Sequence, residues 1–353
     1  MLRKRYENGI YEREKMNKKL ELPVAKSIPI ESYNCHCIFL SVLFNSESYY
    51  KKFYEDYANI CFYDIYMDFC LNIWYIRDSD VFELITADHE GTIIENVYKL
   101  CSRYIKKNDS FVESVIKMLN MGYYFYGVIN EFYVPCRSAT RKKYFLHDFL
   151  VNGYDINEKC FIIYGYGERK IYQKTTISFE DFEKGIKSVH QGEELLCFFK
   201  MKKNVTYNFD LKRVYNNMLD YLHSCNTTCN AEVNEKDSKI YGINVYTKLY
   251  NELKGNTEYL DLRWFRILWE HKKCMKERIS LLKSYGVKIV REVEKEYSRI
   301  VDNHEILFRM AIKYTITRDV KLLTSICDSL LKNKVEEEEL LYDIVAELKR
   351  KIM

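Results

Sequence analysis

Cys35 has the type and the surroundings that covalent catalysis by a thiol requires. It begins the run CHCIFLSVLF, in which Leu40, Leu43 and Phe44 recur at helical spacing. The run therefore predicts a helix that starts near Cys35. In the first turn of a helix, unpaired backbone N–H groups and the positive end of the dipole favour a thiolate, which is the nucleophilic form of cysteine.

His147 is the candidate base, and it lies in the run YFLHDFLVNGYD. The alternation of this run predicts a strand on which Phe149 and Val151 share the face of His147, while Asp148 points the other way. A nucleophile on an early helix and a base on a later strand suit a cysteine hydrolase. Either residue alone is more often structural, because free cysteines are commonly small buried hydrophobes.

Cys37 is a rival nucleophile, because the order CHC places it two residues after Cys35. On a helix the two thiols would face different directions. His36 lies between them and is not expected to be the base, since neighbours i and i+1 do not face each other on a helix.

Composition limits the classes of partner. The 353 residues carry 55 basic and 51 acidic side chains, a balance too mild to indicate nucleic-acid binding without a local patch. No apolar run approaches the roughly 20 residues of a membrane helix. The twelve cysteines are irregularly spaced and the first residues are charged throughout, so we expect a cytoplasmic protein with reduced thiols.

No residue pattern in the sequence calls for a metal or a dissociable cofactor. Cys225 and Cys229 are the only close pair in a polar, asparagine-rich segment. Because two further ligands at zinc spacing are missing, we expect free thiols there.

The chain is predicted to be an α+β protein in three parts. Residues 1–30 form a charged lead-in, 31–203 form an α+β domain, and 204–353 form an α-helical domain. Helices are expected over 47–76 and 90–120, although the first of these segments has enough aromatic residues for a strand.

Strands are expected after Gly122. Three short runs rich in β-branched and aromatic residues, YYFYGVINEFYVP, KYFLHDFLVNGYD and KCFIIYGYG, predict an antiparallel meander. A further strand leads into a helix that Ser178 could cap.

From Tyr207 onward the sequence is helical in pattern, and the aromatic run RWFRILWEHKK is interpreted as core. The acidic residues Glu336 to Glu339 are interpreted as the solvated first turn of the last helix.

The order Asn34-Cys35 at a helix start, followed by HDFLVNGYD from His147 to Asp155, resembles the papain-like domain of bacteriocin-processing peptidases and of the butirosin biosynthesis protein H family. In those families the cysteine begins the helix and the histidine opens a strand that ends in Gly-Tyr-Asp. The resemblance covers roughly residues 28–200. A leucine five residues after the nucleophile is also part of the pattern, and Leu40 selects Cys35 over Cys37. The helical region, through LRWFRILWEHKKCMKERISLL, is similar to relatives found beside nonribosomal peptide genes.

The resemblance implies a papain-like cysteine-peptidase fold and acyl transfer in secondary-metabolite biosynthesis. Cys35 would accept an acyl or aminoacyl group from the thioester of an acyl or peptidyl carrier protein, and an amine of a small molecule or peptide would receive it. His147 would deprotonate Cys35 and then the amine. Two alternatives stay open: a cysteine hydrolase acting on a peptide or thioester, and a catalytically silent binding module accessory to a peptide synthetase.

One departure from the family concerns the residue that orients the histidine. Related enzymes usually place an Asp or Asn at the end of the next strand, where this chain has Tyr164, Gly165 and Tyr166. Asp155 or a backbone carbonyl is left as a substitute. A histidine without an orienting partner loses orders of magnitude in rate in other triads, so this gap is the main support for the silent module.

Overall fold

The computed structural model describes residues 18–56, 59–63, 66–69, 82–86, 110–190, 196–203, 207–227, 239–255 and 260–353. The chain forms two compact units. Unit 1 holds Met1–Val24 and Glu83–Met201, and unit 2 holds Ala25–Phe82 and Lys202–Met353. The fold is mixed α+β with a mostly antiparallel sheet, as the sequence predicts at this coarse level.

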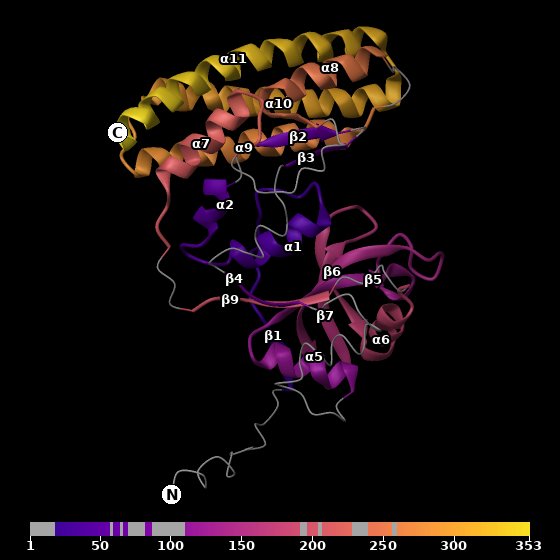
Figure 1. The fold of residues 1–353 in the computed structure, drawn as a ribbon. Coiled ribbons are helices and arrows are strands. Elements are labelled where there is room, and N and C mark those ends of the chain that lie inside the picture. The colour runs from indigo at the N-terminus through magenta and orange to yellow at the C-terminus, as the bar shows by residue number, and fades with distance from the viewer. Residues whose placement is uncertain are drawn as a thin grey trace, which may run out of the picture. The chain divides into compact units, whose positions relative to one another are not determined.

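Unit 1 is built on a sheet with the strand order β4-β9-β5-β6-β7-β8, in which β1 also pairs with β6 (Figure 1). The β5–β6, β5–β9, β6–β7, β7–β8 and β1–β6 pairs are all antiparallel. The strands are β1 (Lys19–Glu21), β4 (Phe82–Thr86), β5 (Tyr124–Asn130), β6 (Leu146–Asp155), β7 (Cys160–Tyr166), β8 (Tyr172–Ser178) and β9 (Leu196–Met201).

Helices α5 (Phe111–Asn120) and α6 (Phe179–Lys187) pack on one face of this sheet. Their apolar sides join the inward residues of β5, β6 and β7 in one buried cluster, with Phe182 of α6 against Phe125 and Phe149. Ser178 caps α6 as predicted, because its side chain accepts the backbone N–H of Asp181 at 3.0 Å.

The predicted meander is confirmed, whereas the helix prediction over 47–76 is wrong in part. Only α2 (Tyr50–Asp56) is helical among the described residues of that range, and Ile60–Tyr63 and Tyr66–Phe69 are strands β2 and β3. Aromatic residues suit a pleated surface, and their local density outweighs the helical spacing. In the range 90–120, α5 is helical and residues 90–109 lie outside the described chain.

Unit 2 combines helices with a small antiparallel sheet (Figure 1). Its further elements are α1 (Asn34–Leu43), α7 (Leu211–Leu222), β10 (Ile240–Tyr241), α8 (Val245–Gly255), α9 (Leu262–Ser284), α10 (Arg291–Thr317) and α11 (Val320–Ile352), and 3₁₀ turns form at Glu131–Tyr133 in unit 1 and Gly242–Asn244 in unit 2. The strand order of the small sheet is β10-β2-β3. The long helices α9, α10 and α11 pack side by side, and α7 and α8 pack on α11.

The interpretation of Glu336 to Glu339 as a solvated first turn is wrong. These residues lie in the middle of α11, and Glu337 is fully buried. No break occurs before them because the apolar stripe of α11 continues through this stretch at helical spacing. None of the described helices is long and apolar enough to cross a membrane.

Residues 31–82 belong to the same compact unit as the C-terminal helices. The sequence interpretation instead placed them in one domain with the large sheet. A compact unit is a weaker concept than a domain, which has its own core and could in principle fold alone. The predicted domain limits, 1–30, 31–203 and 204–353, therefore stay a prediction.

Candidate functional site

His147 lies on β6 of unit 1, paired with Ile129 of β5. Its Nδ1 is 3.0 Å from Oε1 of Glu131, and its side chain is 27% exposed. A carboxylate only accepts hydrogen bonds, so Nδ1 carries the hydrogen, and in the neutral imidazole Nε2 then has the lone pair. Among the described residues, Nε2 makes no hydrogen bond. The contact with Glu131 fixes the orientation of the imidazole ring.

Glu131 reaches His147 because of the way β5 ends. The residue opens a 3₁₀ turn directly after β5, and its N–H donates to the carbonyl of Phe145 at 2.8 Å, which continues the β5–β6 pairing by one step. The side chain of Asn130 accepts the N–H of Phe132 at 3.1 Å and stabilises the turn. Glu131 is thereby fixed at the end of the strand next to the one that carries His147.

Arg137 lies behind Glu131. Its Nε is 3.8 Å from Oε1 of Glu131, and both side chains are buried. Gly165 of β7 leaves room for the guanidinium, because a Cβ there would lie 2.7 Å from Nη2. Burial lowers the pKa of Arg137 while Glu131 opposes that shift. The guanidinium of Arg137 and the carboxylate of Glu131 thus form a buried pair of opposite charges next to His147.

Two aromatic rings flank His147. The Tyr166 ring is 5.9 Å from the imidazole between centroids, and the Phe145 ring is 5.7 Å away. Tyr164, named from the sequence as a possible supporting residue, instead packs its ring on Tyr172 at 5.6 Å.

Asp155 does not orient His147. It lies eight residues further along β6, which is about 26 Å at the rise of a strand. Its carboxylate accepts the N–H groups of Asn157 and Glu158 at 3.0 and 3.2 Å, and it pairs with Lys19 at 3.4 Å. These contacts lower the pKa of Asp155, the backbone bond to Glu158 contributing most. Asp155 therefore stabilises the β6–β7 turn, and Glu131 takes the orienting position that the sequence interpretation left vacant.

Cys35 is the second residue of α1 in unit 2, in the first turn as predicted. The residue before the helix, Tyr33, makes no side-chain cap, and its hydroxyl instead donates to the carbonyl of Met67 at 2.7 Å. The N–H groups of the first turn are thus without a side-chain cap from Tyr33. The side chains of Asn34 and Cys35 lie outside the described part of the structure.

Cys37 and His36 are poorly suited to catalysis. Cys37 is fully buried, with its Sγ 3.7 Å from the carbonyl of Ile30. His36 is also buried, which lowers its pKa to about 4, and its ring lies 5.6 Å from that of Tyr33. A nucleophile must reach its substrate, so the burial of Cys37 argues against this thiol as the nucleophile.

The chain just before Cys35 is held by α9. The buried carboxylate of Glu270 accepts the N–H groups of Glu31 and Ser32 at 3.1 and 3.2 Å and the hydroxyl of Ser32. Arg266, one turn earlier on α9, donates to Glu270 and to Glu31, both at 2.9 Å. The run RWFRILWEH, interpreted from the sequence as core, thus also positions the entry to α1. The core interpretation holds for Trp264 and His271, which are buried.

A second polar cluster lies inside unit 2, and we name it the closed cluster. Its members are Tyr221, Tyr246, Lys272, Tyr297, His304 and Glu337. Lys272 and Glu337 form an ion pair of 2.7 Å with both side chains 0% exposed.

Cys225, predicted as a free thiol, donates to Asp220 at 3.2 Å in the same unit, and Cys229 lies outside the described residues.

The predicted dyad draws one residue from each unit, Cys35 from unit 2 and His147 from unit 1. Within unit 1 the structure joins His147 to Glu131, Arg137 and Tyr166, and sequence reasoning missed Glu131. Comparison with known protein families found no family model that matches the chain, and comparison with curated proteins found no significant match.

Proposed function

We propose that the protein is a cysteine-dependent acyltransferase in which Cys35 is the nucleophile and His147 is the general base. The contact of 3.0 Å between His147 and Glu131 carries the proposal. General-base catalysis requires an imidazole with a fixed tautomer and an accessible second nitrogen, and a carboxylate on Nδ1 supplies the first. The partial exposure of the His147 side chain is compatible with the second.

The position of Cys35 supports its role as the nucleophile. The second residue of a ten-residue helix lies where backbone N–H groups have no intrahelical partner and the dipole is positive. Both effects favour a thiolate over a thiol.

The proposed reaction has two steps. His147 takes the thiol proton of Cys35, the thiolate attacks the carbonyl of a donor thioester, and the donor thiol leaves with that proton. The acceptor amine then attacks the new Cys35 thioester while His147 takes its proton. An amide is released, and the proton returns to the sulfur of Cys35.

The classes of donor and acceptor come from the resemblance to the butirosin biosynthesis protein H family. That resemblance suggests a papain-like fold, a carrier-protein thioester as donor and an amine of a small molecule or peptide as acceptor. The element order supports it, since a helix with an early cysteine precedes an antiparallel sheet with the histidine on an inner strand.

Glu131 also bears on the catalytically silent alternative. That alternative rests on the lack of an orienting carboxylate after β7, and Glu131 supplies one from the end of β5. Hydrolysis remains the alternative within the same chemistry, because water in place of the amine would release an acid from the same Cys35 thioester.

The test is intact-protein mass spectrometry after mixing with an acylated carrier protein or a short acyl N-acetylcysteamine thioester. The expected result is an adduct with the mass of the acyl group that is lost in Cys35→Ala. In His147→Ala the adduct should form about 10²- to 10⁴-fold more slowly, the usual contribution of a general base. Adding an amine should release an amide, whereas spontaneous release of the acid would indicate a hydrolase.

The matched control is Cys37→Ala, two residues from the proposed nucleophile. Because the thiol of Cys37 is buried, this variant should still form the adduct at the rate of the unchanged protein. Adduct formation that persists in Cys35→Ala, or that is insensitive to His147→Ala in a folded protein, would contradict the proposal.

A further inference from the structure

The carboxylate that contacts His147 has a buried cation behind it. Arg137 is 2% exposed, and its Nε lies 3.8 Å from Oε1 of Glu131. The same oxygen lies 3.0 Å from Nδ1 of His147. Oε1 of Glu131 therefore lies in reach of both the guanidinium and the imidazole, and both contacts are made within unit 1.

The turn that carries Arg137 is fixed on two sides. The N–H of Arg137 donates to Oγ1 of Thr140 at 2.9 Å, and the Thr140 hydroxyl donates to the carbonyl of Val134 at 2.6 Å. On the other side, the N–H of Glu168 donates to the carbonyl of Cys136 at 3.1 Å, which ties the turn to the chain after β7. The backbone of Arg137 thus has a defined position relative to the sheet.

Gly165 of β7 determines how closely the guanidinium approaches the sheet. A Cβ at this position would lie 2.7 Å from Nη2 of Arg137, so a larger residue would force the guanidinium to move. Because residue 165 has no side chain, the cation of Arg137 can lie next to Glu131.

Glu131 is the only described carboxylate within ion-pair distance of Arg137. Nη1 of Arg137 is buried and has no hydrogen-bond partner among the described residues. Removing a guanidinium from water is costly unless an opposite charge lies close by. The attraction between Arg137 and Glu131 is stronger in this buried place than it would be in water, and it acts on the oxygen that contacts His147.

We infer that Arg137 is a positioning residue for the proposed reaction. Its guanidinium holds Oε1 of Glu131 against Nδ1 of His147 and so keeps the imidazole hydrogen on Nδ1. A glutamate side chain has several rotatable bonds, so without the cation Oε1 is free to turn away from the imidazole. The role in catalysis rests on the proposed function, whereas the effect on the tautomer is measured without Cys35 or a substrate.

The experiment is long-range proton–nitrogen NMR at alkaline pH on the full chain with labelled histidine. The signals of His147 are identified by their loss in His147→Gln. The unchanged protein should show the hydrogen on Nδ1, whereas Arg137→Met should show a mixture of both tautomers because Glu131 is no longer held. Arg137→Lys keeps the charge and should restore most of the form with the hydrogen on Nδ1.

Gly165→Ala is a second variant, and it leaves the cation in the protein. The added methyl group displaces the guanidinium without removing it, so the tautomer should shift toward the mixture expected in Arg137→Met. Circular dichroism checks that each variant is folded. Gly165→Ala decides the question if Arg137→Met does not fold, because a buried Glu131 without its cation is destabilising.

The matched control in the same loop is Arg141→Met. Arg141 is exposed, and it pairs with Asp181 of α6 at 2.7 Å. The substitution removes the same charge a few residues from Arg137 and should leave the His147 signals unchanged.

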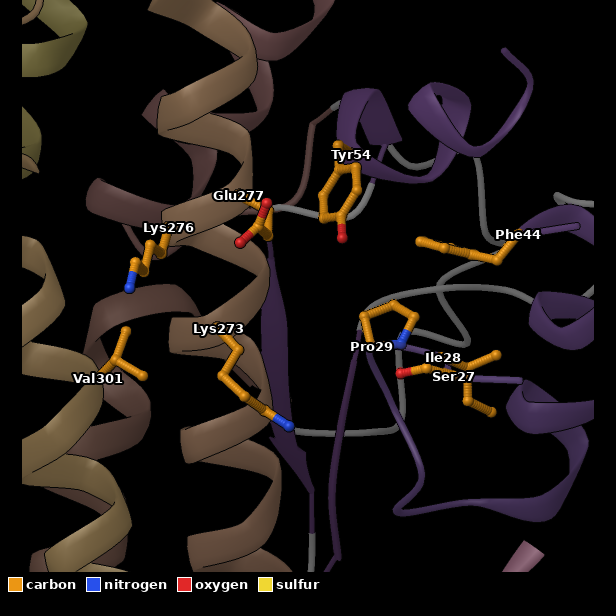
Figure 2. A pocket seen from close by; sticks show the side chains of 9 residues that line it. All are labelled: Ser27, Ile28, Pro29, Phe44, Tyr54, Lys273, Lys276, Glu277 and Val301. Atoms are coloured by element: carbon orange, nitrogen blue, oxygen red, sulfur yellow. The ribbon is translucent and has the colours of Figure 1, made fainter. Parts of the chain in front are cut away.

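A second control removes a cation from unit 2. Lys273 lines a pocket of about 460 Å³, and Figure 2 shows its ammonium group pointing toward the segment 27–29. Lys273→Met changes the net charge of the chain by the same amount as Arg137→Met. It should leave the His147 signals unchanged, which separates a local contact from an effect of overall charge.

The consequence for the proposed reaction is measured as the rate of adduct formation at Cys35. Arg137→Met should slow this rate about tenfold, because the carboxylate remains but is less well placed. The thioester concentration that gives half the maximal rate should change little, since Arg137 acts through Glu131 and not on the substrate. Arg137→Lys should recover part of the rate.

An unchanged tautomer in folded Arg137→Met or Gly165→Ala, or an equal change in Arg141→Met, would overturn the inference. A normal rate of adduct formation beside a changed tautomer would overturn it as well. If the unchanged protein formed no adduct, that result would instead contradict the proposed function, and the tautomer would still decide whether Arg137 positions Glu131.

Discussion

The His147 cluster of unit 1 and the closed cluster of unit 2 use the same chemistry with different results. Each places a buried glutamate beside a histidine or lysine and adds a further charged or aromatic group. Glu131 contacts His147 at 3.0 Å, and Glu337 contacts Lys272 at 2.7 Å. In the first cluster the imidazole is 27% exposed, whereas in the second both charged side chains are fully buried.

The two clusters differ in how many hydrogen-bond partners their polar side chains have. Glu337 accepts bonds from Tyr221, Tyr246 and Tyr297 as well as from Lys272, over distances of 2.6 to 3.1 Å. The Glu337 carboxylate thus has four partners among the described residues, and the closed cluster joins α7, α8, α9, α10 and α11 as a structural element. The His147 cluster keeps a ring nitrogen without a described partner, which is what a catalytic group needs.

The largest expected effect comes from Lys272→Met. The substitution leaves the Glu337 carboxylate buried without its cation, and breaking a buried ion pair in this way costs about 3–5 kcal/mol. Urea unfolding followed by circular dichroism at 222 nm, which reports mainly on helices, measures the loss. The double variant Lys272→Met/Glu337→Gln removes both charges and should lose less than the two single variants together. Strict additivity would contradict the coupling.

Lowering the pH should reduce the free energy of unfolding by a smaller amount, because of His304 in the closed cluster. Burial, aided by the charge of Lys272, lowers the pKa of His304 to about 4, although Glu337 opposes the shift. Between pH 6.5 and 4 the unfolded chain binds a proton that the folded chain does not, so the free energy of unfolding falls as pH falls. The loss is about 3 kcal/mol.

His304→Gln removes this titration and should flatten the dependence of unfolding free energy on pH between 6.5 and 4. His36 has a pKa lowered by burial to the same range, so part of the slope should remain. Urea unfolding at half-unit steps of pH measures both slopes. An unchanged slope would show that His304 takes up its proton in the folded protein.

The next effect concerns the His147 cluster. Glu131→Gln replaces an acceptor by an amide that can also donate, so the imidazole is no longer held in one tautomer. Adduct formation at Cys35 should slow about 100-fold. Glu131→Asp keeps the carboxylate and should recover part of the rate. The matched control is Asp148→Asn, because Asp148 is bound to Tyr126 at 2.7 Å. An equal loss in that control would contradict an orienting role for Glu131.

The sequence predicts strands β5, β6, β7 and β8 of unit 1 because their signal is local. Alternation within single runs is sufficient to locate β5, β6 and β7, and a serine before an acidic turn is sufficient to predict the cap of α6. Glu131 could not be assigned in this way. Its role depends on the register of β5 against β6 and on a turn that starts after Asn130. Together they bring Glu131 into contact with His147, which lies 16 residues later in the sequence.

The closed cluster was missed for a related reason. Four consecutive glutamates suggest a solvated surface, yet a helix turns about 100° per residue and only one of them can face inward. Glu337 lies on the stripe that includes Leu330, Leu341 and Ile344, whereas Glu338 lies off it. The apolar stripe can be recognised in the sequence of α11 alone. The three tyrosines and the lysine that contact Glu337 lie on other helices, so their contacts cannot be predicted from a local pattern.

The smallest effect is expected at an exposed ion pair of unit 1. Arg141 and Asp181 lie 2.7 Å apart, as close as Lys272 and Glu337, but their side chains are 52% and 24% exposed. Water and salt weaken such a pair, so Arg141→Ala should move the thermal midpoint by no more than about 2 °C. Differential scanning calorimetry at low and high salt measures the change. If Arg141→Ala destabilised the protein as much as Lys272→Met, contact distance rather than burial would determine how much an ion pair contributes to stability.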